Sequence, residues 1–312
     1  MSPSETEDGR AGRRVAIAGA GGLIGSSLAA FLADGGHTVL RLVRREKTDA
    51  VDEVAWDPQR GPLHPERLEA LDAMVYLAGE NIASGRWTES RKARLVASRV
   101  GAVRRLVDSL GALEAPPRTL VCASAVGYYG DCGERRVTED APPGDGFLAD
   151  LARRWEDAAR AAEAWGARVV LPRFGVVLSS RGGALAKMLP AFRLGLGGPL
   201  GSGRQLLSWV ALDDAVGALD HALRTADLDG PVNVAAPEPV AQRDFARVLG
   251  RVLRRPAFLP LPAAVLRLVF GEMAEETLLA STGVLPARLK ETGYRFRHPE
   301  LEGALRHELG QS

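Results

Sequence analysis

The chain has 312 residues, of which 46% are hydrophobic and 25% charged, and its 40 basic and 39 acidic residues leave a net charge of +1. The apolar fraction is sufficient to bury a core, which excludes disorder of the whole chain, and the balanced charge excludes a general attraction to nucleic acid or membrane. Only Cys122 and Cys132 occur, which excludes a disulfide scaffold and argues against a cysteine-ligated zinc site.

The first half of the chain alternates between two kinds of hydrophobic pattern. Residues 1–12 are polar and are predicted to form a disordered tail without a secretory signal. Short apolar, β-branched runs then predict strands at 13–18, 38–43, 51–56, 73–77, 119–123 and 168–171. Helical periodicity lies between them, at 23–33, 88–113 and 147–165. The alternation predicts an α/β fold, a Rossmann-type doubly wound parallel sheet over residues 13–180.

The second half has a looser pattern. Five glycines in 195–203 predict a loop, and helical patterns follow at 211–224, 240–253 and 261–281. We expect 205–235 to add to the sheet, 181–255 to lie on the substrate side, and the remainder to complete a smaller, mainly helical subdomain. The apolar stretch 257–270 is interrupted by Pro260, Pro262 and Arg267 and is too short to span a bilayer, so the expected compartment is the cytoplasm.

The turn after the first predicted strand carries the strongest functional signal. Gly19, Gly22 and Gly25 have the spacing G-x-x-G-x-x-G between a strand and a helix. Glycine permits a tight turn and a close approach of the backbone to a pyrophosphate, and the N–H groups of the following helix face the anion. Gly25 lets the helix pack close to the strand. The simple G-x-G-x-x-G pattern is not met, because Ile24 occupies its last position. This context predicts dinucleotide binding.

The end of the second predicted strand indicates which dinucleotide. An acidic residue there binds the ribose 2′-hydroxyl of NAD, whereas an arginine accommodates the 2′-phosphate of NADP. The sequence has Arg44 and Arg45, and the acids Glu46 and Asp49 come later. NADP(H) is therefore favoured over NAD(H). The alternative is that the two arginines form a solvated surface pair.

These features resemble the extended form of the short-chain dehydrogenase/reductase superfamily. Residues 124–130 (SAVGYYG) are similar to the serine segment of sugar-nucleotide epimerases and dehydratases. The resemblance is closer to one atypical branch, an NAD(P)-dependent epimerase/dehydratase-like family of unknown substrate with a C-terminal domain of unknown function. Sequence segments similar to those of that branch occur at 77–82, 173–178, 192–199, 271–275 and 284–288. The resemblance implies an NAD(P)-binding Rossmann domain over 13–180 and a family-specific C-terminal domain over 256–309.

The resemblance also implies where the cofactor binds. Residues 77–79 are similar to the stretch beneath the cofactor's ribose, and Arg99 is placed to contact its ribose or phosphate in place of an absent lysine. The alternative for Arg99 is a salt-bridged helix arginine. The predicted cofactor-binding residues are Gly19, Gly21, Gly22, Leu23, Ile24, Gly25, Val43, Arg44, Arg45, Leu77, Ala78, Gly79, Glu80, Arg99 and Val177.

The catalytic positions implied by the resemblance are largely substituted. Active members of the superfamily use a tyrosine as general acid/base, a lysine four residues later, a serine and an asparagine. Ser124 fills the serine position, Leu148 and Ala152 occupy the tyrosine and lysine positions, and the asparagine position falls on Arg99. Tyr129 is the second candidate for a proton donor, after Ser124. Its alternative role is structural, packing the loop.

Three further expectations concern ligands and partners. Arg204, at the end of the glycine-rich loop, suits a phosphate or carboxylate of the substrate. None of the five histidines pairs with another at metal-ligand spacing, so we expect no metal. The only partner expected is a small-molecule substrate, with neither nucleic acid nor membrane. A homodimer is the possible assembly, although the arginine-rich stretch 88–113 shows no clear apolar seam for pairing helices.

The sequence thus predicts an NADP(H)-binding, atypical short-chain dehydrogenase/reductase with a degenerate active site. It would act as an oxidoreductase or epimerase on a small polar substrate, with Ser124 polarising a carbonyl. The alternative is a non-catalytic NADP(H)-binding sensor or scaffold protein.

Overall fold

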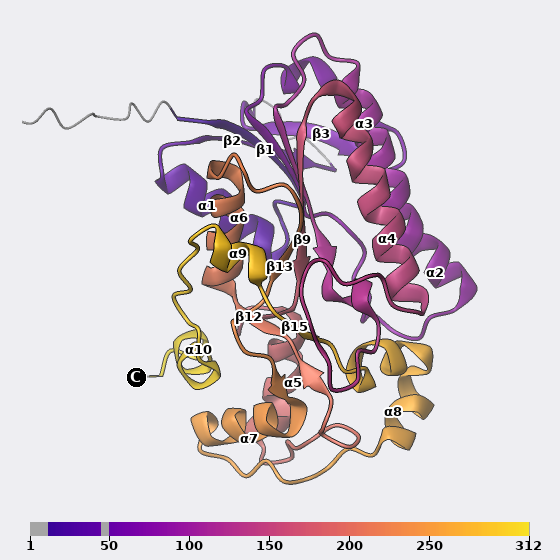
Figure 1. Ribbon diagram of the computed structural model, residues 1–312, viewed down its shortest axis with the longest axis vertical. Coiled ribbons are helices and arrows are strands. Elements are labelled where there is room, and N and C mark those ends of the chain that lie inside the picture. Colours follow the sequence, from indigo (N-terminus) through magenta and orange to yellow (C-terminus); the bar gives the residue numbers. More distant parts are fainter. Residues whose placement is uncertain (1–11, 45–49, 312) are drawn as a thin grey trace, which may run out of the picture.

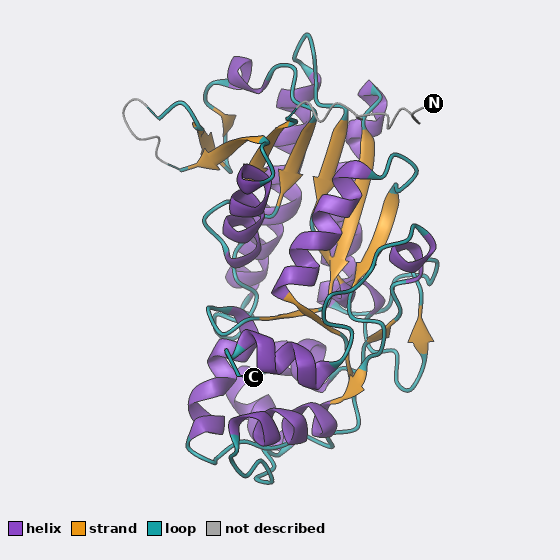
Figure 2. Cartoon of the chain, turned by 90° about the vertical axis from the view of Figure 1, so that its left-hand side faces the viewer, coloured by secondary structure: helices purple, strands orange, loops and turns teal. Residues whose placement is uncertain are grey.

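The computed structural model describes residues 12–44 and 50–311 of the chain. Most of the predicted tail and Arg45 lie outside the described residues. Within the described ranges a large sheet with flanking helices forms one half of the molecule, and a mainly helical assembly that includes the C-terminus forms the other (Figures 1 and 2).

Nine strands of the described residues form the central sheet, in the order β13-β9-β6-β5-β1-β2-β3-β4, with β7 beside β9. All neighbouring strands are parallel except β3 and β4. The strands are β1 (Arg14–Ala18), β2 (Thr38–Val43), β3 (Glu53–Asp57), β4 (Gly61–Pro62), β5 (Ala73–Tyr76), β6 (Thr119–Cys122), β7 (Ser124–Ala125), β9 (Arg168–Phe174) and β13 (Gly230–Val234). This topology confirms the predicted doubly wound α/β sheet. Its strand order reverses between β1 and β5, where open α/β sheets bind ligands.

Helices cover both faces of the sheet (Figure 1). One face is covered by α1 (Leu23–Asp34) and α6 (Leu212–Arg224), which contact each other, and the other by α3 (Ala102–Gly111) and α4 (Phe147–Arg160). Because both faces are covered, the central strands are apolar throughout: Ile17, Met74, Val121 and Val170 have no exposed surface.

The helix predicted at 88–113 is divided into three parts. It consists of α2 (Glu89–Val96), a π-helical stretch η2 (Ala97–Gly101) and α3. A π-helical turn widens the helix by one residue and is frequently found at functional sites. Here it carries Arg99.

A second core lies below the sheet and joins distant segments of the chain. Its buried residues come from α5 (Gly183–Arg193), α7 (Gln242–Leu253) and α10 (Leu301–Glu308), together with the pair β10 (Val176–Leu178) and β12 (Trp209–Ala211). The predicted helical stretch 261–281 contains α8 (Ala263–Phe270) and a π-helical stretch η5 (Ala274–Leu279). The remaining elements are short: β8 (Arg136–Val137), β11 (Leu206–Leu207), β14 (Val240–Ala241), β15 (Gly283–Val284), α9 (Ala287–Glu291), and the 3-10 turns η1 (Pro65–Leu68), η3 (Val126–Tyr129) and η4 (Ala161–Trp165).

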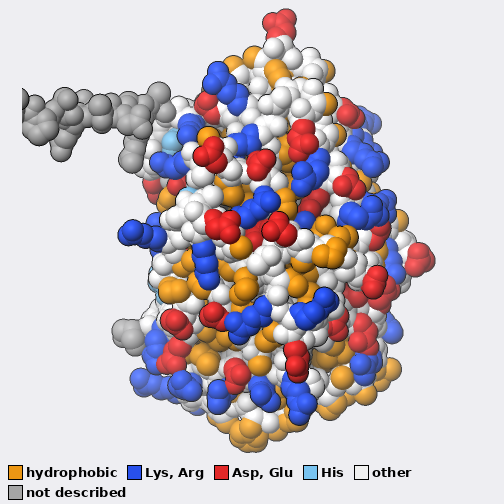
Figure 3. All heavy atoms as spheres, in the orientation of Figure 1, with side chains coloured by type: hydrophobic (Ala, Val, Ile, Leu, Met, Phe, Trp, Pro, Cys, Tyr) orange, Lys and Arg blue, Asp and Glu red, His pale blue; other side chains and the backbone are white. Residues whose placement is uncertain are grey.

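The surface agrees with the composition. On the face in Figure 3, basic and acidic side chains are interspersed, as the net charge of +1 leads one to expect. Among the described residues, no helix combines the length and apolar character needed to cross a bilayer.

Candidate active site

The glycine turn after β1 is packed tightly against the end of β5. Gly19 has φ +88°, and a Cβ there would lie 2.8 Å from the backbone of residues 77 and 78. A Cβ on Gly25 would lie 2.2 Å from the carbonyl oxygen of Gly19. Both positions therefore need glycine. Gly19 needs it because of its positive φ and its contact with the end of β5, and Gly25 because the helix touches the turn there. By contrast, a Cβ on Gly21 would meet nothing within 4 Å, so the outer side of the turn is open.

The N-terminus of α1 faces this open side without a cap. The N-cap residue Gly22 offers no side-chain hydrogen bond, and the first turn of α1 contains no acidic residue. The first N–H groups of a helix have no partner within it and carry the positive end of the helix dipole. Of the predicted cofactor residues, Leu23, Ile24 and Gly25 thus present backbone donors at the switch point of the sheet. This arrangement fits the pyrophosphate of a dinucleotide.

Val177 lies close to this helix end, although it is distant in sequence. A Cβ on Gly183 would lie 3.5 Å from the Val177 carbonyl oxygen and 3.8 Å from the side chain of Leu23. The loop after β10 is also attached to α1, because Arg181 donates a hydrogen bond to Ser27 (3.0 Å). The structure therefore brings this part of the second half to the glycine turn.

Arg44 directly follows Val43, the last residue of β2. Arg44 is exposed and has no ionic partner among the residues that the structure describes, whereas Arg41 on the same strand pairs with Asp52 (2.6 Å). The alternative of a solvated arginine pair involves Arg45, which lies outside the described residues. The guanidinium of Arg44 is thus available at the carboxyl end of β2, next to the carboxyl end of β1, where the glycine turn begins.

Arg99 meets the end of β5 from the π-helical stretch. Its guanidinium donates to the carbonyl oxygen of Glu80 (2.9 Å) and would lie 3.2 Å from a Cβ on Gly79. The guanidinium also donates to the Ser98 hydroxyl (3.4 Å) and lies over the Trp155 ring, 5.2 Å from its centroid. Burial lowers the pKa of Arg99 to about 10, so the side chain is still charged at neutral pH. The salt-bridge alternative for Arg99 does not describe this arrangement: the Glu80 carboxylate is paired with Arg91 instead.

Ser124 belongs to a buried polar network rather than to an open surface. It is 3% exposed, and its hydroxyl donates to the Glu156 carboxylate on α4 (2.6 Å). Glu156 also accepts two hydrogen bonds from Arg173 on β9, at 2.7 and 2.8 Å. Burial lowers the pKa of Arg173, but the hydrogen bonds and charge of Glu156 outweigh this and raise it overall. A hydroxyl has one proton to donate, so Ser124 can polarise a substrate carbonyl only by turning away from Glu156.

Tyr129 lies at the other side of the same network. It is 3% exposed; its hydroxyl donates to Asn233 (2.7 Å) and accepts from Arg173 (2.8 Å). The Arg173 guanidinium also stacks on the Tyr128 ring, 3.4 Å from its centroid. Burial raises the pKa of Tyr129 to about 12, against the lowering by Arg173. The Tyr129 hydroxyl is buried and hydrogen-bonded on both sides within the protein, as in a structural group, and its role as a proton donor stays a prediction.

The C-terminal segment closes the N-terminus of α4. Glu276, in η5, accepts hydrogen bonds from the backbone N–H groups of Phe147 (2.9 Å) and Leu148 (2.7 Å). Gly146, before the helix, has φ +104°, and a Cβ there would lie 3.0 Å from the Glu276 carboxyl group. Leu148, which stands where the superfamily has its tyrosine, thus begins a helix that is capped from 128 residues away. Ala152, one turn further on, is 3% exposed.

Removing this cap is expected to destabilise the fold. Glu276→Ala leaves two helix N–H groups without an acceptor and removes a negative charge from the positive helix end, so the free energy of unfolding should fall by about 1–2 kcal/mol. Chemical denaturation measures the change. Glu275→Ala is the matched control, because its exposed carboxylate pairs with Arg267 on α8 and, within the described ranges, forms no hydrogen bond or ion pair with α4. Equal effects of the two substitutions would contradict the capping role.

Arg204 is exposed, and its backbone N–H donates to Ser202 (3.2 Å). The adjoining loop packs on the C-terminal segment, where Gly201 donates to Leu261 (2.9 Å). Among the described residues, Arg204 forms no hydrogen bond or ion pair with Ser124 or with the glycine turn. The structure therefore groups the cofactor residues, but it does not join Arg204 to them.

Sequence reasoning did not assign roles to Glu156, Arg173, Asn233 and Glu276. One signal was available: Arg173 interrupts the apolar run of β9, and a charged residue there needs a buried partner. Glu156, among the alanines and leucine of the buried face of α4, is the complementary signal. For Glu276 there was no such signal, because its partners are backbone groups far along the chain.

Comparisons with known proteins agree with this geometry. The family model described as "NAD dependent epimerase/dehydratase family" matches residues 15–235, and that of a domain of unknown function (DUF1731) matches 261–308. Epimerase family protein Mb2239 of Mycobacterium bovis is 46% identical over 93% of this chain and 96% of its own length. Human epimerase family protein SDR39U1 is 38% identical over 94% and 98%.

A solved structure extends the comparison to the fold. The crystal structure of human SDR39U1 (isoform2) with NADPH superimposes with a TM-score of 0.87 and 36% identity, covering 96% of this chain and all of that chain. The family model covers well over half of the sequence, and these relatives align over nearly their whole length. The chain therefore belongs to the NAD-dependent epimerase/dehydratase family, and it carries in addition the C-terminal domain of unknown function.

Proposed function

We propose that this protein binds NADP(H) and acts as an oxidoreductase or epimerase on a small polar substrate. The observation that carries the proposal is the uncapped N-terminus of α1, which opens at the switch point beside the turn of Gly19. The family membership supports a nicotinamide dinucleotide, and NADPH in the human relative supports the phosphorylated form. Arg44, charged and without an ionic partner among the described residues, is where the ribose 2′-phosphate would be held.

The residues present define what the chain itself contributes. The N–H groups at the start of α1 hold the pyrophosphate, and Arg99 supplies a fixed positive charge beside Gly79, where the resemblance places the ribose. The bound nicotinamide would supply or accept a hydride. Ser124 would orient the substrate oxygen, and Arg173 would keep Glu156 hydrogen-bonded whenever Ser124 turns toward the substrate.

Denaturing the purified protein and identifying the released nucleotide by mass spectrometry tests the proposal. Retained NADP(H), or NADP(H) that exchanges from the medium, is the expected result. Retained NAD(H) would overturn the role of Arg44 and would favour an epimerase that regenerates its cofactor between half-reactions.

Arg44→Ala is expected to weaken NADPH binding at least tenfold, about 1.4 kcal/mol, because a charge-assisted contact to the 2′-phosphate is removed. NADH affinity should stay within twofold, since NADH lacks that phosphate. Titration of both cofactors, followed by nicotinamide fluorescence, measures the two constants. Arg247→Ala on α7 is the control, an exposed arginine paired only with Asp244 on the same helix. NADPH binding that Arg44→Ala leaves unchanged would contradict the assignment.

A second candidate is a non-catalytic NADP(H)-binding sensor or scaffold. It is favoured by Leu148 and Ala152 at the tyrosine and lysine positions and by the buried, doubly bonded Tyr129. Ser124→Ala distinguishes the two functions. For an enzyme, the variant should lose carbonyl reduction or epimerisation while it still binds NADPH. A wild-type protein that binds NADPH but turns over no carbonyl substrate would support the sensor.

A further inference from the structure

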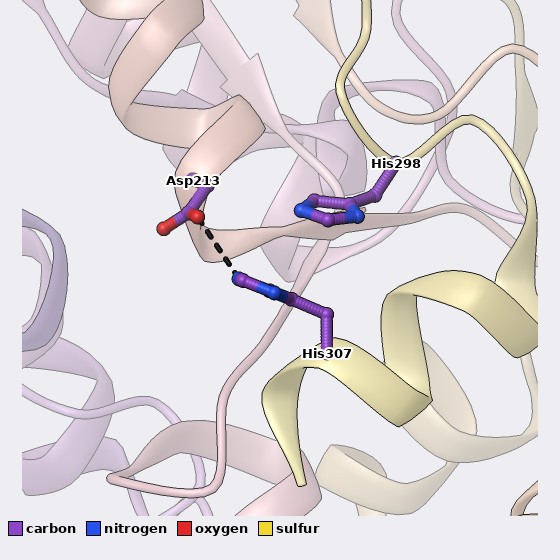
Figure 4. Close-up of side chains that lie close together, drawn as sticks. All are labelled: Asp213, His298 and His307. Carbon is purple, nitrogen blue, oxygen red and sulfur yellow. Dashed lines mark hydrogen bonds and ion pairs between the residues drawn. The ribbon is translucent and has the colours of Figure 1, made fainter. Parts of the chain in front are cut away.

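Two of the five histidines and a carboxylate meet at a site away from the glycine turn. Asp213 is in the first turn of α6, His298 lies in the loop before α10, and His307 is in the last turn of α10 (Figure 4). His307 Nε2 is 3.0 Å from Asp213 Oδ2, and the two imidazole rings stack with centroids 4.2 Å apart. One donor atom from each of the three residues lies within 4.8 Å of the others. Spacing along the chain predicts no metal site because these residues converge only in the fold.

The surrounding contacts hold the backbone that carries these three side chains. The neighbouring carboxylate of Asp214 is buried and accepts the backbone N–H groups of Arg297 (2.7 Å) and His298 (2.9 Å), which fixes the loop that carries the His298 ring. The helix that carries His307 is anchored by Leu305, which has no exposed surface. The fixed backbone positions mean that only side-chain rotations separate the present arrangement from a coordinating one.

The carboxylates at this junction are not equivalent. Asp214 is fully engaged with backbone donors and Tyr294, and Glu308 accepts the N–H of Leu212 (3.2 Å). Asp213 has His307 as its side-chain partner and is 41% exposed. Asp213 is therefore the carboxylate that can bind an ion without breaking a backbone hydrogen bond, and the other two add negative charge around it.

We propose that Asp213, His298 and His307 form a binding site for Zn²⁺. Two imidazole nitrogens and one carboxylate oxygen are a ligand set that zinc accepts, with water completing the coordination. In tetrahedral coordination at metal–ligand distances of about 2.0–2.1 Å, two ligand atoms lie about 3.4 Å apart. The present donor atoms are up to 4.8 Å apart and the two rings are stacked, so binding the ion requires the imidazole rings to rotate out of the stack until their nitrogens converge. The ion would bind His307 at a ring nitrogen that carries no proton, because zinc coordinates neutral imidazole.

Zinc at this site would join the C-terminal segment to the start of α6. His298 and His307 lie within or beside α10, and α6 packs against the central sheet. The ion would thus connect the second core to the sheet through side chains that take no part in the proposed cofactor site. The site would act as a structural clamp, and none of its three ligands is among the proposed cofactor residues.

Titration of the metal-free, untagged full-length chain with ZnCl₂ tests the proposal. The expected result is one Zn²⁺ per chain by calorimetry, with a rise in Tm of roughly 5 °C at a hundredfold excess of free Zn²⁺ over Kd. MgCl₂ should give no comparable shift, because Mg²⁺ prefers oxygen ligands. Replacing Zn²⁺ by Co²⁺ should add visible absorption bands of a nitrogen-ligated site.

Variants locate the site. His307→Ala and His298→Ala should each weaken Zn²⁺ binding at least tenfold, since even the loss of an outer-shell partner costs 10- to 100-fold. Asp213→Asn keeps the shape of the side chain and replaces the histidine variants if they do not fold. His64→Ala is the control, an exposed histidine paired only with Glu66 (3.2 Å), and should bind as wild type does. Absence of Zn²⁺ binding to the wild-type chain, or binding that survives all three substitutions, would overturn the proposal.

Discussion

Replacing Gly25 by alanine is expected to reduce the affinity for NADP(H) on the order of 100-fold, about 2.7 kcal/mol. The new methyl group would lie 2.2 Å from the Gly19 carbonyl oxygen, so either the turn or α1 must shift. Both carry the backbone groups that the proposed cofactor contacts. Fluorescence titration with NADPH measures the loss.

The control for this substitution is Gly303→Ala on α10. A Cβ on Gly303 meets nothing within 4 Å, and its backbone is helical, so NADPH binding should be unchanged and the chain slightly more stable. Circular dichroism and thermal unfolding show whether Gly25→Ala still folds. A folded Gly25→Ala variant that binds NADPH as tightly as wild type would exclude the glycine turn as the cofactor site.

The second large effect is expected at Arg173. Arg173→Met leaves the Glu156 carboxylate buried without its cation and removes a donor from Tyr129, so the free energy of unfolding should fall by about 3–5 kcal/mol. The corresponding fall in Tm is roughly 5–10 °C. Removing the charge on both partners, with Arg173→Met and Glu156→Gln together, should recover part of the loss. Urea denaturation of the single and double variants gives the coupling between the two residues.

An exposed arginine provides the comparison. Arg153, on the outer side of α4, pairs with Asp150 at 2.8 Å, and its side chain is 50% exposed. Arg153→Met should cost less than about 1 kcal/mol, because exposed ion pairs contribute little. If Arg173→Met proved no more destabilising than Arg153→Met, or if the double variant were no more stable than the single one, the network around Ser124 would not have the role assigned to it.

The sheet could be predicted because its signal is local. Parallel strands buried on both faces are continuous apolar runs, as at 73–77, and the glycine turn after the first strand has a spacing that can be read without the fold. The π-helical stretch at Arg99 leaves no such mark, since its residues continue the helical pattern of their neighbours. The sequence therefore predicts the parallel α/β sheet and the cofactor-binding turn. It does not predict the widened helix that brings Arg99 to the end of β5.

The rest of the site depends on pairings across the chain. Glu276 meets the start of α4 because two segments more than a hundred residues apart are packed together, and no periodicity encodes which carboxylate does so. The same holds for Tyr129 in the turn η3 and Asn233 on β13, which are hydrogen-bonded although they are 104 residues apart. Tyr129 as a proton donor was a hypothesis from proximity in sequence to Ser124. In the structure the two residues belong to one hydrogen-bond network. Arg173 bonds both to Tyr129 and to the Glu156 carboxylate that accepts the Ser124 hydroxyl.

The contacts of Glu276 and α10 bear on how such a protein can change during evolution. The C-terminal family model begins at residue 261, yet the segment beyond that point supplies the α4 cap and contributes Leu301, Ala304 and Leu305 to a core shared with α5 and α7. A gene fusion or truncation at this boundary would therefore expose apolar surface on one side and an uncapped helix on the other. We therefore expect the two regions matched by separate family models to be gained, lost and exchanged together.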